Sequence, residues 1–320
     1  FSALGYGEAQ ELSPTQVVIL GLNDLGASIH RRVSAMPEHF KVIGTFNRDS
    51  AVIPGETPLL KSLDTVMSLH PDAVVDALTD FEPAQSLVTH FLERGASVVS
   101  TNLALIADAG RELAALAARR NTYLRYNGAI GGSTPMLEAL RRELHQSDIQ
   151  SIAAVFGGEA SRILDRCSKG FEFEELLLNA TAELGSSVVH QELSGTCAAR
   201  KLCVLARHAF GCDPDALRVE ALDAESLKKA RDSLSENYTL RLVARAWKIS
   251  HRIFGQLQLE ALDTRDPLAQ VQPEWNRLLI HHRDGRHKVI HGRDGPWPTT
   301  EAVMADLLEV RFAHLALAGP

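Results

Sequence analysis

Residues 17–26 read Val-Val-Ile-Leu-Gly-Leu-Asn-Asp-Leu-Gly, and this stretch decides the fold class of the chain. The first four residues form a short apolar run rich in β-branched side chains, which is typical of a buried strand. Gly21 follows at once, and apolar residues at helical spacing then extend from Leu25 to Val33. A strand, a glycine turn and a helix in this order predict the start of a doubly wound α/β domain.

The same alternation of strands and helices continues through the first part of the chain. Apolar runs at 41–46, 73–78, 97–100 and 123–126 alternate with helical stretches that include 82–94 and 110–120. This alternation predicts a parallel sheet with right-handed crossovers. We expect a dinucleotide-binding domain over residues 15–135, preceded by a flexible arm or linker over residues 1–14.

The pattern changes after Pro135 and predicts a second, α+β domain over residues 136–298. Helical periodicity at 136–143 and 173–184 is followed by strand-like runs at 257–262, 278–282 and 288–291. Pro298 and the polar residues after it mark the start of a last helix, predicted over residues 300–311. We expect the segment 299–320 to pack back on the cofactor domain.

The composition favours small-molecule chemistry. The chain has 320 residues, a net charge of −7 and only 6% aromatic residues, which argues against a nucleic-acid or anionic-membrane surface. No apolar run approaches the roughly 20 residues of a membrane helix. The four cysteines have no C-x-x-C spacing, so we expect reduced thiols and a cytoplasmic location.

The glycine turn carries the prediction of a bound dinucleotide. Gly21 permits a tight turn, Gly26 permits close packing of the helix, and the free amides at the helix N-terminus face a pyrophosphate. The predicted contact residues are the six of the turn: Gly21, Leu22, Asn23, Asp24, Leu25 and Gly26. Asn23 occupies the position of the middle glycine, where its side chain crowds the diphosphate, so an ordinary strand-helix turn remains the alternative.

The end of the second predicted strand indicates which dinucleotide binds. Arg48 stands there, with no acid directly at the strand end. A guanidinium favours a ribose 2′-phosphate, whereas a carboxylate favours the free hydroxyl. We therefore expect NADP in preference to NAD, with Asp49 keeping NAD open.

Four further segments carry a family resemblance. Residues 98–106 read V-V-S-T-N-L-A-L-I and are similar to "V-V-T-A-N-K-A-L-L", and residues 195–202 read G-T-C-A-A-R-K-L beside "G-x-D-A-A-R-K-L". Residues 124–132 match a Gly-rich turn between two domains, and residues 298–307 echo "P-T-A-S-A-V-V-A-D-L". In order and spacing, the chain resembles homoserine dehydrogenase over about residues 16–312.

The resemblance implies a Rossmann-type cofactor domain followed by a catalytic and dimerisation domain in a homodimer. It also implies the reversible, NAD(P)-linked interconversion of L-homoserine and L-aspartate 4-semialdehyde. Four more cofactor-binding residues follow from it: Thr79, Thr101, Asn102 and Gly295. The family's Gly-rich turn further implies a possible monovalent cation at the backbone of Asn127, Ile130 and Gly132, and no other metal is expected.

The chain departs from the family at the residues that manage the hydroxyl proton. The lysine of "N-K-A" is Leu103 here, and a leucine can neither shuttle a proton nor polarise a carbonyl oxygen. The second family lysine is retained as Lys201, but the aspartate four residues earlier is Cys197. Residues four apart share a helix face, so both should point into one cavity. With Glu192, which keeps an acid at a later matching position, these are the predicted catalytic residues.

Two loops gain charge where the family is small or neutral, and we expect them to bind the substrate. The family's "N-G-T" becomes Gly157, Gly158 and Glu159, and its "G-x-G-A-G" becomes a loop that includes Arg293. These changes fit an oxidoreductase acting on homoserine or on another small amino or hydroxy acid. They fit equally a catalytically silent NADP(H)-binding homologue with a sensor or partner-binding role. A third reading makes the chain the dehydrogenase part of a larger fusion, with residues 1–14 as the linker.

Histidines cluster on a predicted hairpin near the end of the chain. If Asp284-Gly285 is a two-residue turn, His282 and His287 lie cross-strand, close enough to be two metal ligands. No cysteine or paired carboxylate completes a metal site in the sequence. We therefore expect solvated histidines here.

Overall fold

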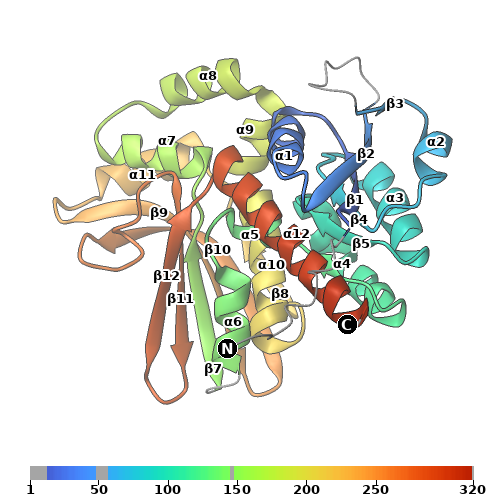
Figure 1. The fold of residues 1–320 in the computed structure, drawn as a ribbon. Coiled ribbons are helices and arrows are strands. Elements are labelled where there is room, and N and C mark those ends of the chain that lie inside the picture. Colours follow the sequence, from blue (N-terminus) through green and yellow to red (C-terminus); the bar gives the residue numbers. More distant parts are fainter. Residues whose placement is uncertain (1–12, 48–56, 145–147, 319–320) are drawn as a thin grey trace, which may run out of the picture.

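The described residues form two six-stranded sheets, one in each half of the sequence. The computed structural model describes residues 13–47, 57–144 and 148–318. Figure 1 shows the first sheet and its helices on one side, the second sheet with its long strands on the other, and the last helix crossing between them. No helix within these residues is long and apolar enough to cross a membrane.

The first sheet is entirely parallel and has the order β3-β2-β1-β4-β5-β6. Its strands are β1 (Thr15–Leu20), β2 (Phe40–Phe46), β3 (Leu59–Leu60), β4 (Ala73–Asp76), β5 (Ser97–Ser100) and β6 (Leu124–Arg125). Since β1 lies between β2 and β4, the strand order reverses at β1. This confirms the predicted doubly wound sheet.

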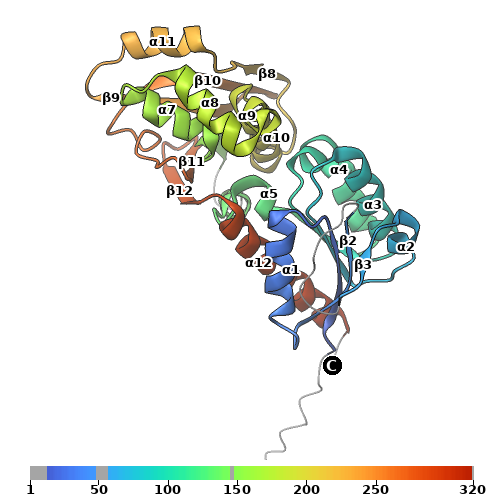
Figure 2. The same ribbon diagram turned by 90° about the horizontal axis from the view of Figure 1, so that it is seen from above.

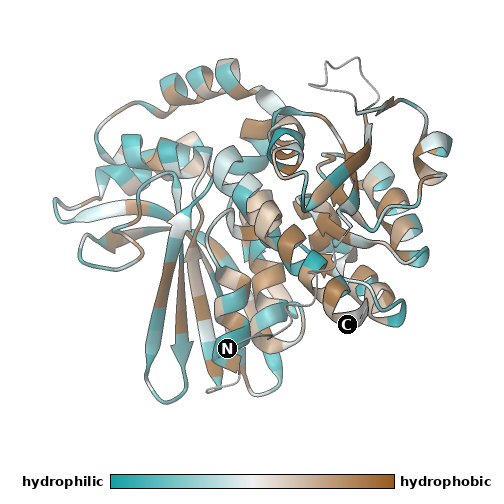
Figure 3. Ribbon diagram, in the orientation of Figure 1, coloured by the Kyte–Doolittle hydropathy of each residue, from teal (hydrophilic) through white to brown (hydrophobic). Residues whose placement is uncertain are grey.

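Helices cover both faces of the first sheet, because successive side chains of a strand point to opposite faces. Val18 and Leu20 pack toward α3 (Phe81–Glu93) and α4 (Leu103–Arg119), while Val17 and Ile19 pack toward α1 (Asp24–Ser34) and α12 (Pro296–Ala318). The short α2 (Leu63–Met67) lies beside β2 and β3. Figure 3 shows hydrophobic residues concentrated in these strands.

The second sheet has the order β12-β11-β7-β9-β10-β8 and is antiparallel except for the pair β8 and β10. Its strands are β7 (Ile149–Val155), β8 (Ala216–Val219), β9 (Tyr238–Ile249), β10 (Arg252–Asp263), β11 (Trp275–His282) and β12 (His287–Arg293). One face packs on helices, and the loop 264–272 covers part of the other. The sequence patterns missed β7, β8 and β9.

Seven helices connect the two sheets and cover the second. They are α5 (Asn127–Gly131), α6 (Met136–Leu144), α7 (Glu159–Ser168), α8 (Phe173–Leu184), α9 (Ser186–Leu193), α10 (Thr196–Phe210) and α11 (Ala224–Asp232). Cys197 and Lys201 both lie on α10, as their spacing predicts.

The last helix returns to the first domain. It runs alongside α1, as Figure 2 shows, and is longer than its predicted range. Arg32 Nε and Glu301 Oε1 lie 3.0 Å apart, and Thr300 Oγ1 donates to Ser28 Oγ at 3.1 Å. The first domain is therefore completed by residues from the other end of the described chain.

The hairpin between β11 and β12 differs from the prediction by one residue. His281, not His282, is the cross-strand partner of His287. The turn is wider than two residues because the His282 amide donates to the Arg286 carbonyl at 2.9 Å. The pleat then directs His282 to the other face, where it is buried and its Nε2 lies 3.2 Å from Glu143 Oε2.

Candidate active site

The glycine turn after β1 is packed so tightly that side chains are excluded at two positions. A Cβ at Gly26 would lie 2.1 Å from the Gly21 carbonyl oxygen. Gly21 has a φ of +90°, and a Cβ there would lie 2.7 Å from the Ala77 carbonyl oxygen. Both glycines are needed to bring the N-terminus of α1 against the end of β1, at the carboxyl edge of the sheet.

Asn23 makes protein contacts and does not use the left-handed backbone that asparagine tolerates. Its φ is −67°, and its side chain caps α1 by accepting from the Gly26 amide at 2.9 Å. Its Nδ2 donates to the Ala77 carbonyl at 3.0 Å. These bonds direct the amide group toward the end of β4. Asp24 is exposed, while Leu22 and Leu25 are half-buried.

A buried acid, Asp76, ends β4 at the same edge. Ser100 Oγ donates to Asp76 Oδ2 at 2.7 Å, and the Asn102 amide donates to Ser100 Oγ at 3.1 Å. Burial outweighs these bonds and raises the pKa of Asp76 to about 6. Thr101 donates to the Asp76 carbonyl, so the predicted cofactor residues Thr101 and Asn102 both hold this edge together. Sequence reasoning missed Asp76, which reads as part of an apolar run.

Thr79 lines a cavity of about 710 Å³ between the two domains. The cavity extends from the loop after β4 and the start of α4 to Gln191 on α9 and Arg200 on α10. Arg200 Nη2 lies 3.1 Å from Asp108 Oδ2, which links α10 to α4 beside it. The predicted cofactor residue Arg48 lies outside the described residues.

Lys201 stands in a largely buried cluster of polar groups. Its Nζ lies 3.2 Å from Asp294 Oδ2 and 5.2 Å from the centre of the Phe156 ring. Cys197 lies one turn earlier on α10, and the nearby Glu192 carboxylate raises the pKa of both side chains. A Cβ at Gly158, whose φ is +136°, would lie 2.8 Å from Glu192 Oε2. The structure thus brings together the three predicted catalytic residues and Gly158.

Electrostatics fix the protonation states within this cluster. Burial alone would lower the pKa of Lys201, but the Asp294 and Glu192 carboxylates outweigh it and raise that pKa. Burial and the nearby Glu192 raise the pKa of Cys197 to about 11. At neutral pH the lysine is therefore a cation, and the cysteine is a neutral thiol.

Asp294 and Asn276 complete the cluster, and sequence reasoning assigned neither of them. Asn276 is fully buried, accepts from the Gly157 amide at 2.8 Å and donates to the Gly131 carbonyl at 3.0 Å. It thereby joins the loop after β7 to the turn between the domains. Only the charge gained in the loop after β12 hinted at Asp294, and nothing in the sequence singles out Asn276.

Leu103 shows what replaces the family's first lysine. It opens α4 and packs against the apolar core of the second domain, on the cluster that includes Ile106. This position therefore presents no proton donor.

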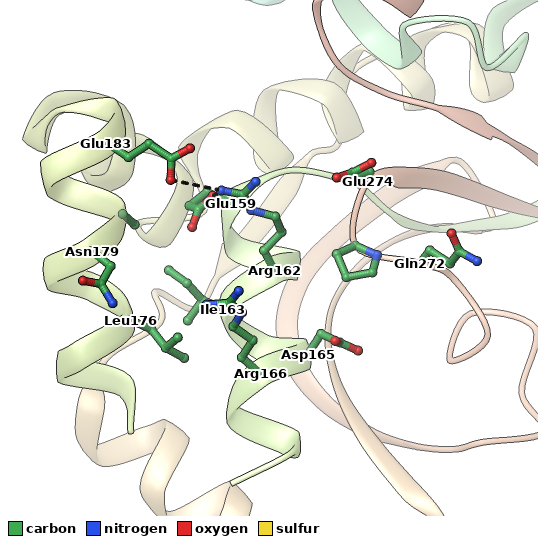
Figure 4. Close-up of a pocket in the computed structure, with 12 residues that line it drawn as sticks. Glu159, Arg162, Ile163, Asp165, Arg166, Leu176, Asn179, Glu183, Gln272 and Glu274 are labelled. Carbon is green, nitrogen blue, oxygen red and sulfur yellow. Dashed lines mark ion pairs between the residues drawn. The ribbon is translucent and has the colours of Figure 1, made fainter. Parts of the chain in front are cut away.

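Two of the predicted substrate-binding residues point elsewhere. Glu159 lines a second cavity of about 550 Å³ between α7 and α8, where its carboxylate lies 2.7 Å from Arg162 Nη2. Figure 4 shows Arg162 spanning this cavity toward Glu183 on α8. Arg293 is exposed, and its guanidinium lies over the Trp275 ring. Gly295, by contrast, directly follows Asp294 and donates its amide to that carboxylate at 2.8 Å.

The turn between the domains contains a buried pair. Asn127 donates from its backbone amide and from Nδ2 to Asp306 on α12, at 3.1 and 2.6 Å. Asn127 Oδ1 is buried and has no hydrogen-bond partner among the described residues. Burial raises the pKa of Asp306 to about 7. Within the described part of the chain, histidine, cysteine, aspartate and glutamate form no group of three that could hold a metal ion.

Two family models together match most of the chain. The model of homoserine dehydrogenase matches residues 135–308, and that of the homoserine dehydrogenase NAD binding domain matches residues 21–127. The boundary between them coincides with the Gly-rich turn.

Curated relatives share about a quarter of their residues with this chain. Homoserine dehydrogenase of Lactococcus lactis is 24% identical over 92% of this chain and 73% of its own length. Those of Synechocystis and Corynebacterium glutamicum are both 28% identical over 74% of this chain. The matched regions span only 57% and 56% of those two relatives.

Solved structures share the architecture. A homoserine dehydrogenase from Thiobacillus denitrificans has a TM-score of 0.84 at 25% identity, over 95% of this chain and 74% of its own. A putative homoserine dehydrogenase from Archaeoglobus fulgidus has a TM-score of 0.78 at 21% identity, over 93% of this chain and 99% of its own. The second likeness supports the fold alone.

Proposed function

The chain belongs to the homoserine dehydrogenase family, and from that membership we propose that it is an NAD(P)-dependent oxidoreductase that acts on homoserine and aspartate 4-semialdehyde, or on a related small amino or hydroxy acid. The observation that carries the proposal is the position of Lys201. Its partner Asp294 lies two residues before α12, and α12 packs on α1, the helix that the glycine turn opens. The retained family lysine is thus connected through Asp294 and α12 to the helix that follows the predicted cofactor turn.

The turn supports dinucleotide binding on steric grounds. Gly21 and Gly26 leave the N-terminus of α1 open for close backbone approach, which suits a pyrophosphate. The 710 Å³ cavity between Thr79 and Arg200 offers room at the same edge of the sheet. The preference for NADP over NAD rests on Arg48 in the sequence.

The protonation state of Lys201 indicates its role in the reaction. When bound, the dinucleotide supplies the hydride for reduction or accepts it in oxidation. Because Asp294 and Glu192 raise its pKa, Lys201 is charged at neutral pH and can donate a hydrogen bond, and then a proton, to a carbonyl oxygen. In the oxidative direction the lysine must first lose that proton. The site is therefore better prepared for reducing an aldehyde.

Glu192 is proposed to contact the substrate's ammonium group. It stands against Gly158, where the missing side chain leaves room for the Glu192 carboxylate. With Cys197 neutral and Asp294 engaged by Lys201, Glu192 is the remaining acid of this cluster without an ion-pair partner among the described residues. A small substrate with an amino group suits this charge.

One experiment separates a working enzyme from a silent one. NADPH and NADH are titrated into the purified protein, and aspartate 4-semialdehyde is then mixed with the complex while nicotinamide absorbance is followed. We expect tighter binding of NADPH and its consumption. Binding without consumption of this or related aldehydes favours the alternative, a silent NADP(H)-binding homologue, which the apolar setting of Leu103 supports. Failure of both nucleotides to bind contradicts both functions.

We also propose a homodimer that forms through the second sheet. The face opposite the helices carries the stacked rings of Trp247 and Phe254, 6.0 Å apart, beside the ion pair of Arg245 and Glu260. Such a mixed apolar and charged face is suited to a subunit interface. Sedimentation equilibrium tests this proposal, and a monomer at micromolar concentration contradicts it.

A monovalent cation and a cytoplasmic location complete the proposal. The unpartnered oxygen of Asn127 beside the Asp306 carboxylate suits a cation held by oxygen atoms near the backbone of Asn127, Ile130 and Gly132. All four cysteines are free, which fits a reducing compartment.

A further inference from the structure

Position 197 lies one helical turn before Lys201 but carries no negative charge. In the motif that this segment resembles, an aspartate stands four residues before the lysine, whereas Cys197 stands here. Burial raises the pKa of that thiol to about 11, so it stays neutral at neutral pH. A mostly buried ammonium without a counter-charge is strongly unfavourable. Another group must therefore balance Lys201.

Asp294 is the group in direct contact with Lys201, and the more distant Glu192 carboxylate adds to its effect. Among the described residues, it is the one carboxylate that lies within ion-pair distance of Lys201, at 3.2 Å. The lysine side chain is 15% exposed and the aspartate side chain 21%, so water screens this pair much less than a surface pair. In the motif that this loop resembles, the same position is an alanine. One acid has thus been lost from α10, and one has been gained on another element.

The backbone around Asp294 orients its carboxylate. The Asp294 amide donates to the Glu274 carbonyl at 2.9 Å, and Oδ1 accepts from the Gly295 amide at 2.8 Å. Oδ2 is left to Lys201. A Cβ at Gly132 would lie 3.1 Å from Asp294 Oδ1, so the glycine leaves room for the carboxylate.

We infer that Asp294 is a positioning residue that takes over, from the loop between β12 and α12, the role of the carboxylate missing at position 197. It supplies the counter-charge of Lys201 and fixes the direction of its Nζ. The role of Lys201 in turnover rests on the proposed function, whereas the exchange of carboxylates between the two positions does not.

A set of variants at positions 197 and 294 tests the exchange. Asp294→Asn removes the charge and keeps an oxygen for the Gly295 amide. Cys197→Asp combined with Asp294→Asn returns a carboxylate one turn before Lys201. Cys197→Ser combined with Asp294→Asn is the matched control, with the same positions changed and no charge returned.

The first readout is the pKa of Lys201, which needs no turnover. Lysines are dimethylated with ¹³C-formaldehyde, the Lys201 signal is assigned with Lys201→Arg, and its shift is followed against pH. We expect the pKa to fall in D294N, to recover in C197D/D294N and to stay low in C197S/D294N. An unchanged pKa in D294N, or equal values in the two double variants, overturns the inference. If D294N is too unstable for the pKa measurement, the Tm of each variant is compared instead. The inference then requires that C197D/D294N has a higher Tm than D294N and that C197S/D294N does not.

The second readout is reduction of aspartate 4-semialdehyde. Loss of orientation at Lys201 should lower kcat in D294N by about 10- to 100-fold and leave the KM for NADPH within about twofold. C197D should recover most of that loss. If the wild type shows no turnover while the pKa pattern holds, the proposed function fails and the carboxylate exchange stands. If turnover occurs and D294N matches the wild type in both readouts, the exchange fails and the proposed function stands.

Discussion

A single lysine carries most of the chemistry at the residue scale, and its neighbours decide its state. Lys201 could be predicted from sequence because residues 195–202 resemble a motif of the homoserine dehydrogenase family. Asp294 lies far away in the sequence, and its contact with Lys201 exists only after the second sheet forms. Asn276 is harder still, because a buried asparagine in a strand has no local signature. The sequence thus predicts functional residues that belong to a continuous motif, and it does not predict those that only the fold brings to the site.

Removing the lysine should separate binding from turnover. Lys201→Met is expected to lower kcat for aldehyde reduction by about 100-fold or more, because the donor aimed at the carbonyl oxygen is lost. The affinity for NADPH should stay within about threefold. Lys169→Met, which changes an exposed lysine directly after the C-terminus of α7, is the control. A K201M protein with wild-type kcat would exclude Lys201 from the chemistry.

The glycine turn makes a steric prediction. Gly26→Ala places a Cβ 2.1 Å from the Gly21 carbonyl oxygen, so the turn must open. We expect about 1–3 kcal/mol lower stability and at least tenfold weaker NADPH binding. Gly110→Ala on α4 is the control, because its Cβ would lie no closer than 3.4 Å to any side chain beyond its two neighbours in the chain, and the change should stabilise the helix slightly. Urea unfolding and fluorescence titration measure both quantities, and equal behaviour of the two variants contradicts this account.

The elements of the first domain were easier to predict than those of the second. Continuous apolar runs marked β1, β4 and β5, because strands buried on both faces need no alternation. β7 and β9 lie at the centre of the second sheet, and neither of them was predicted from the sequence. In β9 the apolar residues that face the helices alternate with Arg241 and Arg245, so a period of two was present but was not recognised. The hairpin shift that moved His282 to the core likewise came from turn geometry.

The closing helix α12 makes a packing prediction. Leu307 is fully buried against the first sheet, whereas Phe312 on the same helix is 64% exposed. Leu307→Ala should cost about 2–5 kcal/mol of unfolding free energy, because it leaves a cavity between α12 and the sheet. Phe312→Ala should cost less than about 1 kcal/mol. Comparable losses in urea unfolding would show that α12 does not pack as described.

Asp306 on the same helix makes the stability depend on pH. Burial raises its pKa from the ordinary 3.8 to about 7, so the folded protein binds this proton more tightly than the unfolded chain does. Its contribution is complete below about pH 4 and is lost as the pH rises to about 7. The pKa of the buried Asp76 is also raised, to about 6, so its contribution to stability likewise falls as the pH rises. The test therefore compares the variant with the wild type. Asp306→Asn should flatten the fall in Tm between pH 5 and 8, and an unchanged slope would contradict the buried acid.

At the scale of the whole molecule, two domains share one cleft, and α10 joins them. Arg207 on α10 donates to the carbonyls of Ile106 and Ala107 on α4, and its Nε lies 2.5 Å from Asp213 Oδ1. Beside it, the Tyr126 hydroxyl and His208 Nε2 lie 3.0 Å apart. This group of contacts fixes how the second domain meets the first.

Loss of the Arg207 contacts should lower the free energy of unfolding and loosen the coupling between the two domains. Arg207→Ala removes the second hydrogen bond of two α4 carbonyls and the ion pair with Asp213, and we expect about 1–3 kcal/mol lower stability with a less cooperative unfolding transition. Arg265→Ala is the control, because that side chain is 89% exposed and pairs only with Asp263 nearby. Calorimetry measures both, and a single unshifted transition in R207A would show that other contacts hold the domains.

The return of α12 also constrains how the protein folds as it is made. Val17 and Ile19 are synthesised before the second domain, but the residues that cover them on one face, among them Val303 and Leu307, are synthesised after it. Until then that face of the first sheet stays exposed to solvent and to chaperones, while its other face already has α3 and α4. Of these two domains, the one that is translated earlier is therefore completed later, because vectorial synthesis cannot finish it before the second domain has emerged.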